Sequence, residues 1–262
     1  MQLSDLIGHE LGSHTVTFDD RDAILYAIAL GAGPDELDLV YEKRLRVLPT
    51  LACALGLWAV EAAGELGAYD RQRSLHAAQS LQMHAPLEPG ALTMSGRISA
   101  VWDKGKAAVV IIEVTSDTFT AGYTIFLPGL GGWGGERGPS SRRGTAFEPT
   151  WSTQMPTRSD QAILYRLTGD RHPLHIDAQL ARSMGFKRPI LHGLCTLGMA
   201  AKHLAAAANA HPADLIELNA RLAAPVLPGD TLELSAQQDP ELTFQVRVGD
   251  TPVLKAGRAR YG

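Results

Sequence analysis

A carboxylate and an imidazole lie five residues apart in residues 165–177, whose sequence is YRLTGDRHPLHID. Because Gly169 and Pro173 punctuate this segment, we expect Asp170 and His175 to project from an irregular turn and not from a regular element. The two side chains can hold one water molecule between them. Asp170 would accept a proton from the water while His175 forms a hydrogen bond to it. Such a pair is equipped to add water to a double bond or to remove it.

A second informative stretch, PILHGLC at residues 189–195, opens a run rich in Ala and Leu that predicts a long helix. The first N–H groups of a helix have no partner within the helix. The N–H of Gly193 is therefore a candidate to stabilise negative charge that develops on a substrate oxygen. A small residue needed for close packing is the alternative explanation of Gly193.

Four neighbours of these residues are predicted to contact the substrate: His172, Pro173, His192 and Leu194. We interpret His192 as a structural neighbour of the pair and not as a proton carrier. A metal site built from the three histidines is disfavoured, because His172 and His175 share a tight turn and no further ligand pattern surrounds them. We therefore expect no metal.

The motif YxLTGDxxPLH at residues 165–175, together with GFKRPILHGL at residues 185–194, resembles the MaoC-like, hydratase 2 family. A further stretch, IFLPGLGGWGG at residues 125–135, is similar to the segment that joins the two halves of the double-hotdog members. The resemblance covers nearly the whole chain. It implies an (R)-specific 2-enoyl-CoA hydratase that needs no cofactor. One departure stands out, since His172 occupies the position where the family has Asn.

Each candidate also has a purely structural explanation. Asp170 could be a turn or cap residue, and His175 could be a hydrogen-bonded core histidine. Taken singly, these explanations would be favoured. The spacing to the PILHG block, which matches the family, favours the catalytic interpretation of both residues together with Gly193.

The composition is that of a globular protein of 262 residues, with 45% hydrophobic and 20% charged residues. The net charge of −4 argues against nucleic acid as a partner. The first residues show no signal-peptide pattern, and no apolar run is long enough to span a bilayer. Cys53 and Cys195 fall in apolar helical patterns, which favours buried thiols over a disulfide or a nucleophile. We expect a cytoplasmic protein that does not bind membranes.

An internal repeat organises the chain. AILY at residues 23–26 recurs at residues 162–165, an offset of 162 − 23 = 139. The same offset relates Pro34 to Pro173, and the Pro-Gly pair at 89–90 to the pair at 228–229. The chain is therefore predicted to contain two copies of one unit. The predicted fold class is α+β: two tandem hotdog folds, each a long helix wrapped by an antiparallel sheet, together resembling a dimer.

The predicted boundaries are an N-terminal hotdog at 1–127, a Gly-rich linker at 128–148 and a catalytic C-terminal hotdog at 149–262. Long helices are predicted near 50–66 and 194–208. Strands are predicted near 81–87, 91–102, 106–115 and 118–127 in the first copy, and near 219–226, 230–236, 242–248 and 252–261 in the second. The fused copies predict a monomer or a homodimer.

Only the second copy carries the acid–imidazole pair. At the repeat offset, Asp170 falls on Gly31 and His175 falls on Glu36. The first copy is therefore predicted to lack chemistry. The resemblance implies that the first half accommodates the tail of the acyl group.

The segment between the copies contains GLGGWG at residues 129–134, which matches the glycine pattern of dinucleotide sites. No helix pattern follows it, so we interpret it as a flexible linker. Two pairs of basic residues are candidates for the phosphates of coenzyme A, although solvated surface charges explain them equally. They are Arg142, Arg143, Lys187 and Arg188.

Two other functions compete with hydration of an acyl-CoA thioester. A hotdog thioesterase would resemble its relatives in carrying a carboxylate on the central helix; the second-copy helix has none, but the first-copy helix has Glu61 and Glu65. A non-catalytic acyl-CoA-binding protein is the third hypothesis, with His172 marking decay of the site. The acyl chain, whether straight, branched or polycyclic, is left open.

Overall fold

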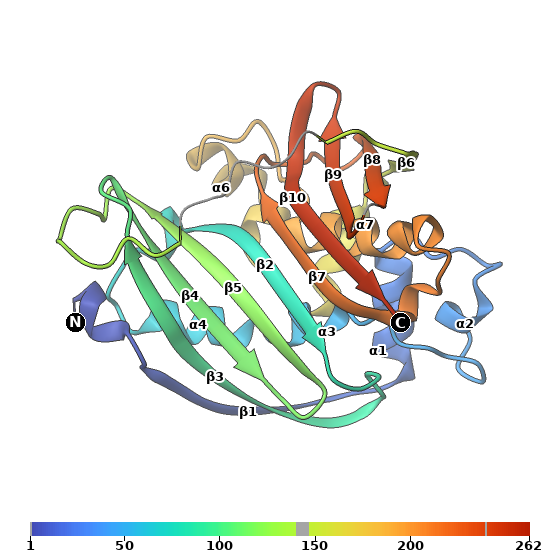
Figure 1. Ribbon diagram of the computed structural model, residues 1–262, viewed down its shortest axis with the longest axis horizontal. Helices are drawn as coiled ribbons and strands as arrows, with labels where there is room; N and C mark the ends of the chain where they lie inside the picture. The colour runs from blue at the N-terminus through green and yellow to red at the C-terminus, as the bar shows by residue number, and fades with distance from the viewer. Residues whose placement is uncertain (1, 140–146, 239) are drawn as a thin grey trace.

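The computed structural model describes residues 2–139, 147–238 and 240–262, and their strands form one antiparallel sheet (Figure 1). The ten strands within these ranges follow the order β1-β3-β4-β5-β2-β7-β10-β9-β8-β6. Their bounds are β1 Glu10–Phe18, β2 Leu75–Met83, β3 Gly90–Asp103, β4 Ala107–Thr115, β5 Phe119–Pro128, β6 Trp151–Pro156, β7 Leu215–Leu222, β8 Thr231–Gln238, β9 Leu242–Val248 and β10 Thr251–Tyr261.

The strand order displays the internal repeat. Read from its two edges inward, the sheet runs β1-β3-β4-β5-β2 on one side and β6-β8-β9-β10-β7 on the other, so each strand has a counterpart. The halves join where β2 pairs with β7, and Ser80 lies opposite Asn219. These two residues are 219 − 80 = 139 apart, which is the repeat offset. The approximate two-fold axis therefore passes through this pair, and the two copies meet as the subunits of a dimer would.

The helices pack on one face of the sheet (Figure 1). Their bounds are α1 Asp20–Ala29, α2 Leu37–Val40, α3 Leu51–Leu55, α4 Trp58–Glu65, α5 Gln161–Tyr165, α6 Ala178–Ser183 and α7 Gly193–Ala207, with short 3₁₀ turns η1 Leu3–Leu6, η2 Arg71–Arg73, η3 Arg166–Thr168, η4 Pro173–His175 and η5 Pro212–Asp214. Within the described residues, no helix has both the length and the hydropathy that a membrane crossing requires.

The long helix predicted near 50–66 is divided into α3 and α4, whereas its counterpart α7 is continuous. The division has a tertiary cause. The hydroxyl of Tyr123 on β5 donates to the carbonyl of Cys53 at 2.8 Å. The N–H of Leu57, which would bond to that carbonyl in a regular α-helix, bonds to Ala54 O at 3.3 Å instead. A side-chain carbon at Gly56 would overlap the same Tyr123 hydroxyl, so the break also requires a glycine.

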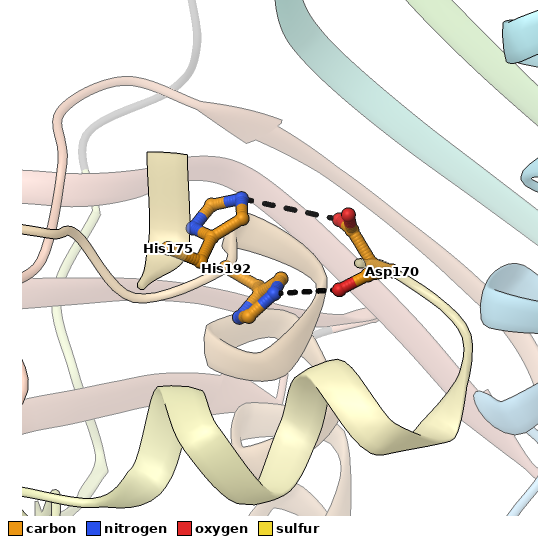
Figure 2. A group of neighbouring side chains, drawn as sticks. All are labelled: Asp170, His175 and His192. Atoms are coloured by element: carbon orange, nitrogen blue, oxygen red, sulfur yellow. Dashed lines mark hydrogen bonds and ion pairs between the residues drawn. The ribbon is translucent and has the colours of Figure 1, made fainter. Parts of the chain in front are cut away.

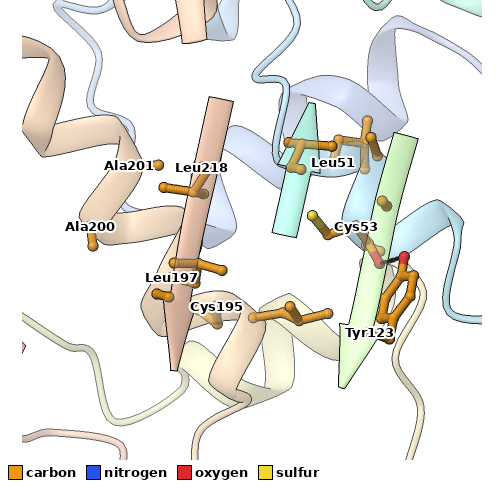
Figure 3. Packing of buried hydrophobic residues seen from close by; sticks show 14 of the residues in the cluster. Leu51, Cys53, Tyr123, Cys195, Leu197, Ala200, Ala201 and Leu218 are labelled. Carbon is orange, nitrogen blue, oxygen red and sulfur yellow. Dashed lines mark hydrogen bonds between the residues drawn. The ribbon is translucent and has the colours of Figure 1, made fainter. Parts of the chain in front are cut away.

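The core is shared between the copies. Leu51 and Cys53 of α3 and Leu197 of α7 lie in the same buried cluster, close to Leu218 of β7 (Figure 3). Each such side chain is at most 2% exposed, and burying a leucine contributes about 1.5–3 kcal/mol. The two halves are thus held together by apolar packing as well as by the β2–β7 ladder.

The two cysteines are buried free thiols. Burial raises the pKa of Cys53 to about 12 and raises the pKa of Cys195 well above its ordinary value. Cys195 therefore stays protonated, with its Sγ 3.6 Å from Ala29 O. This state agrees with the structural interpretation of both residues and not with a nucleophile.

The Gly-rich segment after β5 is less free than its composition predicts. The carboxylate of Asp103, at the end of β3, accepts the N–H groups of Gly132 and Gly134, both at 2.8 Å. These backbone bonds, with that of Gly132 the largest, lower the pKa of Asp103 to about 2. Lys104 Nζ also donates to Pro139 O at 3.0 Å. Residues 129–139 are therefore fixed against the β3–β4 hairpin, which corrects the expectation of a flexible linker for this part; Arg142 and Arg143 lie outside the described residues.

Candidate active site

The turn that carries Asp170 and His175 begins where α5 and η3 end. Thr168 Oγ1 donates to Tyr165 O at 2.8 Å, and Gly169 then stops the helix with φ of 144°. A side-chain carbon at this glycine would lie 3.3 Å from the carbonyl oxygen of Ala54 in α3. The turn in the second copy is therefore seated on the central helix of the first copy. Only glycine satisfies both its backbone angle and this close approach.

The next residues fix one oxygen of Asp170. Its Oδ1 accepts the N–H of His172 at 3.1 Å. His172 Nδ1 in turn accepts the N–H of Leu174 at 3.2 Å and so caps η4. Because Oδ1 is occupied by the turn itself, Oδ2 is the carboxylate oxygen that remains for other partners.

His175 presents a bare nitrogen to that oxygen (Figure 2). Its Nδ1 lies 2.9 Å from Ile190 O. A carbonyl only accepts hydrogen bonds, so we assign the proton to Nδ1 and a lone pair to Nε2. Nε2 faces Asp170 Oδ2 at 4.0 Å, which is too long for a direct hydrogen bond.

Two acceptors at this separation fit a water molecule that donates one hydrogen to each of them. The oxygen of such a water keeps its lone pairs for attack on a carbon. The side chains of His175 and Asp170 are 11% and 22% exposed, so the pair is enclosed but reachable. Burial lowers the pKa of His175, and the negative charge of Asp170 only partly opposes this. The imidazole is therefore neutral at neutral pH, as an acceptor of a water proton must be.

His192 supports the pair from below. Its Nε2 lies 3.1 Å from the backbone oxygen of Asp170, and its ring stacks on the ring of His175 at 3.6 Å between centroids (Figure 2). Tyr165 packs on the other side with 4.9 Å between ring centroids. Burial lowers the pKa of His192 to about 3. A neutral imidazole fixed in this way can orient Asp170 and His175, which agrees with its interpretation as a structural neighbour of the pair.

Ligand atoms of Asp170, His175 and His192 lie within 4.8 Å of one another, so this cluster also has to be considered as a metal site. Two of the ring nitrogens are already committed, however. Nδ1 of His175 and Nε2 of His192 both face backbone carbonyls and act as donors. One nitrogen of each ring and the carboxylate of Asp170 remain, which is three ligand groups where a closed structural site has four. The absence of a metal stays a prediction.

Gly193 is the first residue of α7 and directly follows His192, so a helix N-terminus lies beside the pair. No side chain caps this end, since His192 makes no capping hydrogen bond. A side-chain carbon at Gly193 would overlap Leu222 of β7. The glycine thus has a packing role whether or not its N–H meets a substrate, and both explanations given by the sequence stay open.

The remaining candidates are spread around this centre. His172 and Pro173 are exposed on the turn, whereas Leu194 is only 4% exposed and belongs to the core. Lys187 and Arg188 are exposed between α6 and α7. The turn residues are therefore accessible from solvent, whereas Leu194 is not.

One neighbour of the site was missed by the sequence analysis. His76 lies on β2 of the first copy, and the charge of Asp170 acts on it, although burial is the larger influence and lowers its pKa. A single histidine in an irregular pattern carries no local signal, and only the folded arrangement brings it near the turn.

Two hotdog halves joined through β2 and β7 define a double-hotdog protein, and its described residues place an acid–imidazole pair beside a helix N-terminus. Its two halves match two family descriptions. Residues 16–128 match the MFE-2 hydratase 2 N-terminal domain, and residues 144–256 match the MaoC like domain. The chain belongs to the MaoC-like hydratase 2 family, which confirms the family and the fold predicted from the sequence.

Individual relatives are similar over most of the chain. The 3-hydroxyacyl-thioester dehydratase Y of Mycobacterium tuberculosis is 38% identical over 81% of this chain and 79% of its own length. Enoyl-CoA hydratase ChsH3 of the same organism is 36% identical over 91% of this chain and 90% of its own. Among solved structures, a MaoC-like dehydratase from Phytophthora capsici has a TM-score of 0.90 at 25% identity, covering 100% of this chain and 98% of that one.

Proposed function

We propose that this chain catalyses the reversible hydration of trans-2-enoyl-CoA to (R)-3-hydroxyacyl-CoA. The observation that carries the proposal is the Asp170–His175 pair, two hydrogen-bond acceptors held 4.0 Å apart. The relatives whose names are enoyl-CoA hydratase and 3-hydroxyacyl-thioester dehydratase support the same reaction in its two directions. The (R) configuration follows from the family alone, because nothing in the two side chains fixes the face attacked.

The reaction starts with water bound between Asp170 Oδ2 and His175 Nε2. As the water oxygen forms a bond to C3 of the enoyl group, one O–H bond breaks and the pair takes up that proton. The electrons of the C2–C3 double bond move toward the thioester oxygen, where the N–H of Gly193 stabilises the negative charge. The pair then returns a proton to C2, so that one molecule of water has been added to one face of the double bond.

This chemistry is redox-neutral and consumes only water besides the enoyl-CoA, so it requires no redox cofactor. Coenzyme A enters as a portion of the substrate. Activation of the water is assigned to the two side chains, which is why no metal is included in the proposal. An enclosed carboxylate and a neutral imidazole supply about 10²–10⁴-fold of rate as general base and acid.

The two competing functions receive less support. Glu61 and Glu65, the carboxylates that a thioesterase would need on the central helix, have side chains 69% and 73% exposed and both face Arg71. For a protein that only binds acyl-CoA, the replacement of Asn by His172 would have to disable the turn. His172 instead caps η4, and its own N–H holds Asp170 Oδ1.

The test is to mix the purified protein with trans-2-enoyl-CoAs of short and medium chain and to follow loss of the conjugated enoyl absorbance. Chiral analysis of the product and assay of free coenzyme A would accompany it. We expect an (R)-3-hydroxyacyl product, no release of coenzyme A, and a rate lower by about 10²–10⁴-fold in Asp170→Asn. Release of coenzyme A would establish the thioesterase instead, and tight binding without turnover would establish the non-catalytic protein.

Several finer points accompany this proposal as expectations. The length of the acyl chain is left open by the residues described above. A cytoplasmic location and a monomeric or homodimeric state stay predictions. Light scattering of the purified chain would decide the oligomeric state.

A further inference from the structure

His76 is turned toward the helices by an irregularity in β2. Gln79 and Leu81 of this strand are 2% and 1% exposed and face the helices. Strict alternation would place Leu75 on the same face, yet Leu75 is 52% exposed. The pairing of β2 with β5 shifts register between His76 and Ala78, which marks a β-bulge. The bulge exchanges the two faces and turns His76 inward, a device that is common beside active sites.

Short contacts connect His76 to the catalytic turn. Its ring lies 5.8 Å from the ring of Tyr123 between centroids, and the Tyr123 hydroxyl bonds to Cys53 O of α3. The next residue of α3, Ala54, is the one on which Gly169 rests. The imidazole itself is held by a contact of 3.1 Å between Nε2 and Ala78 O. His76 therefore lies on the side of the first copy that faces the turn carrying Asp170. The charge of Asp170 raises the pKa of His76, although burial has the larger effect and lowers it.

The approximate two-fold axis provides an internal comparison. The repeat position of His76 is residue 76 + 139 = 215, which is Leu215 at the start of β7. The second-copy turn rests on the first copy, so the two-fold relation predicts that the first-copy turn rests on the second. Leu30 of the first-copy turn does pack on Gly198 of α7. An inward imidazole is thus present on the side that faces the acid–imidazole pair. On the side that faces the degenerate turn, the equivalent residue is an apolar side chain that is 3% exposed.

We propose that His76 is a specificity-determining residue, supplied by the first copy, which limits the width of the acyl chain just beyond the reacting double bond. The inference rests on the proposed hydratase activity. An acyl group whose C2 and C3 lie at the Asp170–His175 pair is next to the first copy, because Gly169 of the same turn rests on Ala54 of α3. On this side of the first copy the bulge turns the imidazole inward. The substrate class that fits is an enoyl-CoA unbranched at C4, and removal of the imidazole admits a branch there.

The experiment compares kcat/KM for a linear trans-2-enoyl-CoA and for its 4-methyl analogue of equal chain length. In His76→Ala we expect the branched-to-linear ratio to rise about tenfold or more, the usual effect of one methyl group in a tight pocket. The matched control is Leu75→Ala, the adjacent residue on the outer face, which should leave the ratio within about twofold of wild type. His76→Gln keeps a donor for Ala78 O and similar bulk, so it should also keep the ratio low.

The outcomes separate this inference from the proposed function. Turnover of the linear substrate by the wild type establishes hydration independently of His76. If His76→Ala then shows the same ratio as Leu75→Ala, His76 does not set specificity and the inference is overturned. If His76→Ala does not fold, the folded His76→Phe variant decides instead: with its larger ring it must lower the ratio below that of wild type, and an unchanged ratio overturns the inference as well.

Discussion

The turn at residues 169–175 and its repeat at residues 30–36 occupy equivalent places in the two copies but treat charge in opposite ways. In the second copy, Asp170 and His175 are held 4.0 Å apart, enclosed and without a direct contact. In the first copy, Glu36 stands at the position of His175 and contacts Lys202 Nζ at 2.8 and 2.9 Å. The second-copy turn holds its carboxylate and imidazole without a direct contact between them, whereas the first-copy turn pairs its carboxylate with a lysine.

Residues that follow Glu36 in the first copy also contact ionisable side chains of the second copy. Asp38 contacts His211 at 2.8 Å, and Arg46 contacts Asp214 at 2.5 Å. All these contacts join the first copy to α7 or to the residues that follow it. The comparison indicates that the duplication has divided the work: the second-copy turn carries the pair to which we assign the chemistry, and the first-copy turn binds the two halves to each other.

The largest effect should come from removing the imidazole of the open pair. We expect His175→Asn to lower kcat/KM by about 10²–10⁴-fold, because the amide cannot take up the proton of the water. The matched change in the other turn, Glu36→Gln, should lower kcat/KM less than about tenfold, since it touches stability and not the reacting atoms. Steady-state hydration of an enoyl-CoA measures both variants.

The same assay can contradict the comparison. In the proposed reaction Asp170 and His175 act on one water, so the double variant Asp170→Asn/His175→Asn should be little worse than either single variant. Equal losses of activity in His175→Asn and Glu36→Gln would mean that the turns are not divided in function.

The next largest effect is on the free energy of unfolding, and we expect it in the first-copy turn at residues 30–36. Lys202 has a side chain only 7% exposed, and Glu36 is its partner. Loss of the partner of a buried charge costs about 3–5 kcal/mol, and the 35% exposure of Glu36 reduces this through solvent screening to about 2–3 kcal/mol for Glu36→Gln. Urea unfolding measures this loss of the free energy of unfolding.

The matched rescue is Glu36→Gln combined with Lys202→Met, which removes both charges and keeps the length of the buried side chain. We expect it to recover most of the stability. A double variant as unstable as the single one would show that the methylene packing of Lys202, and not its charge, supports α7.

The contrast between the turns also shows what a sequence can reveal. Three features were predictable, because short stretches of the sequence show them directly. They are the repeat offset, the acid–imidazole pair and the start of α7. The ion pair of Glu36 with Lys202 joins residues 166 positions apart, and neither residue has a local signal for it. The division of α3 from α4 likewise depends on Tyr123, 70 positions from Cys53. Edge strands β1 and β6 were missed, because their polar, half-exposed sequences show little buried periodicity.

A third effect, smaller in free energy, distinguishes the glycines of the two turns. Gly169 has φ of 144° and Gly31 has φ of 83°. An alanine at Gly169 would meet both backbone strain and the Ala54 carbonyl, whereas at Gly31 nothing lies within 4 Å. We expect Gly169→Ala to cost about 2–3 kcal/mol and Gly31→Ala about 1 kcal/mol. Thermal unfolding measures both, and similar losses would show that Ala54 does not restrain the turn that carries Asp170.

The smallest expected effect is on the pH dependence of the open pair, because burial lowers the pKa of His175 from its ordinary value of 6.5. The neutral imidazole, which the water needs as an acceptor, therefore persists below pH 6.5. An ordinary histidine would lose about threefold in its neutral fraction between pH 7 and pH 6, so we expect kcat/KM to fall by less than this over the same range.

The sign for stability follows from the same shift. The unfolded chain binds the His175 proton more readily than the folded chain, so the stability that the neutral buried imidazole contributes is present above pH 6.5 and is lost as the pH falls through its lowered folded pKa. Replacement of His175 by Asn should flatten this part of the curve of unfolding free energy against pH. If kcat/KM instead falls with a midpoint at or above pH 6.5, burial does not lower the pKa of His175. The two turns would then differ less than their geometry indicates.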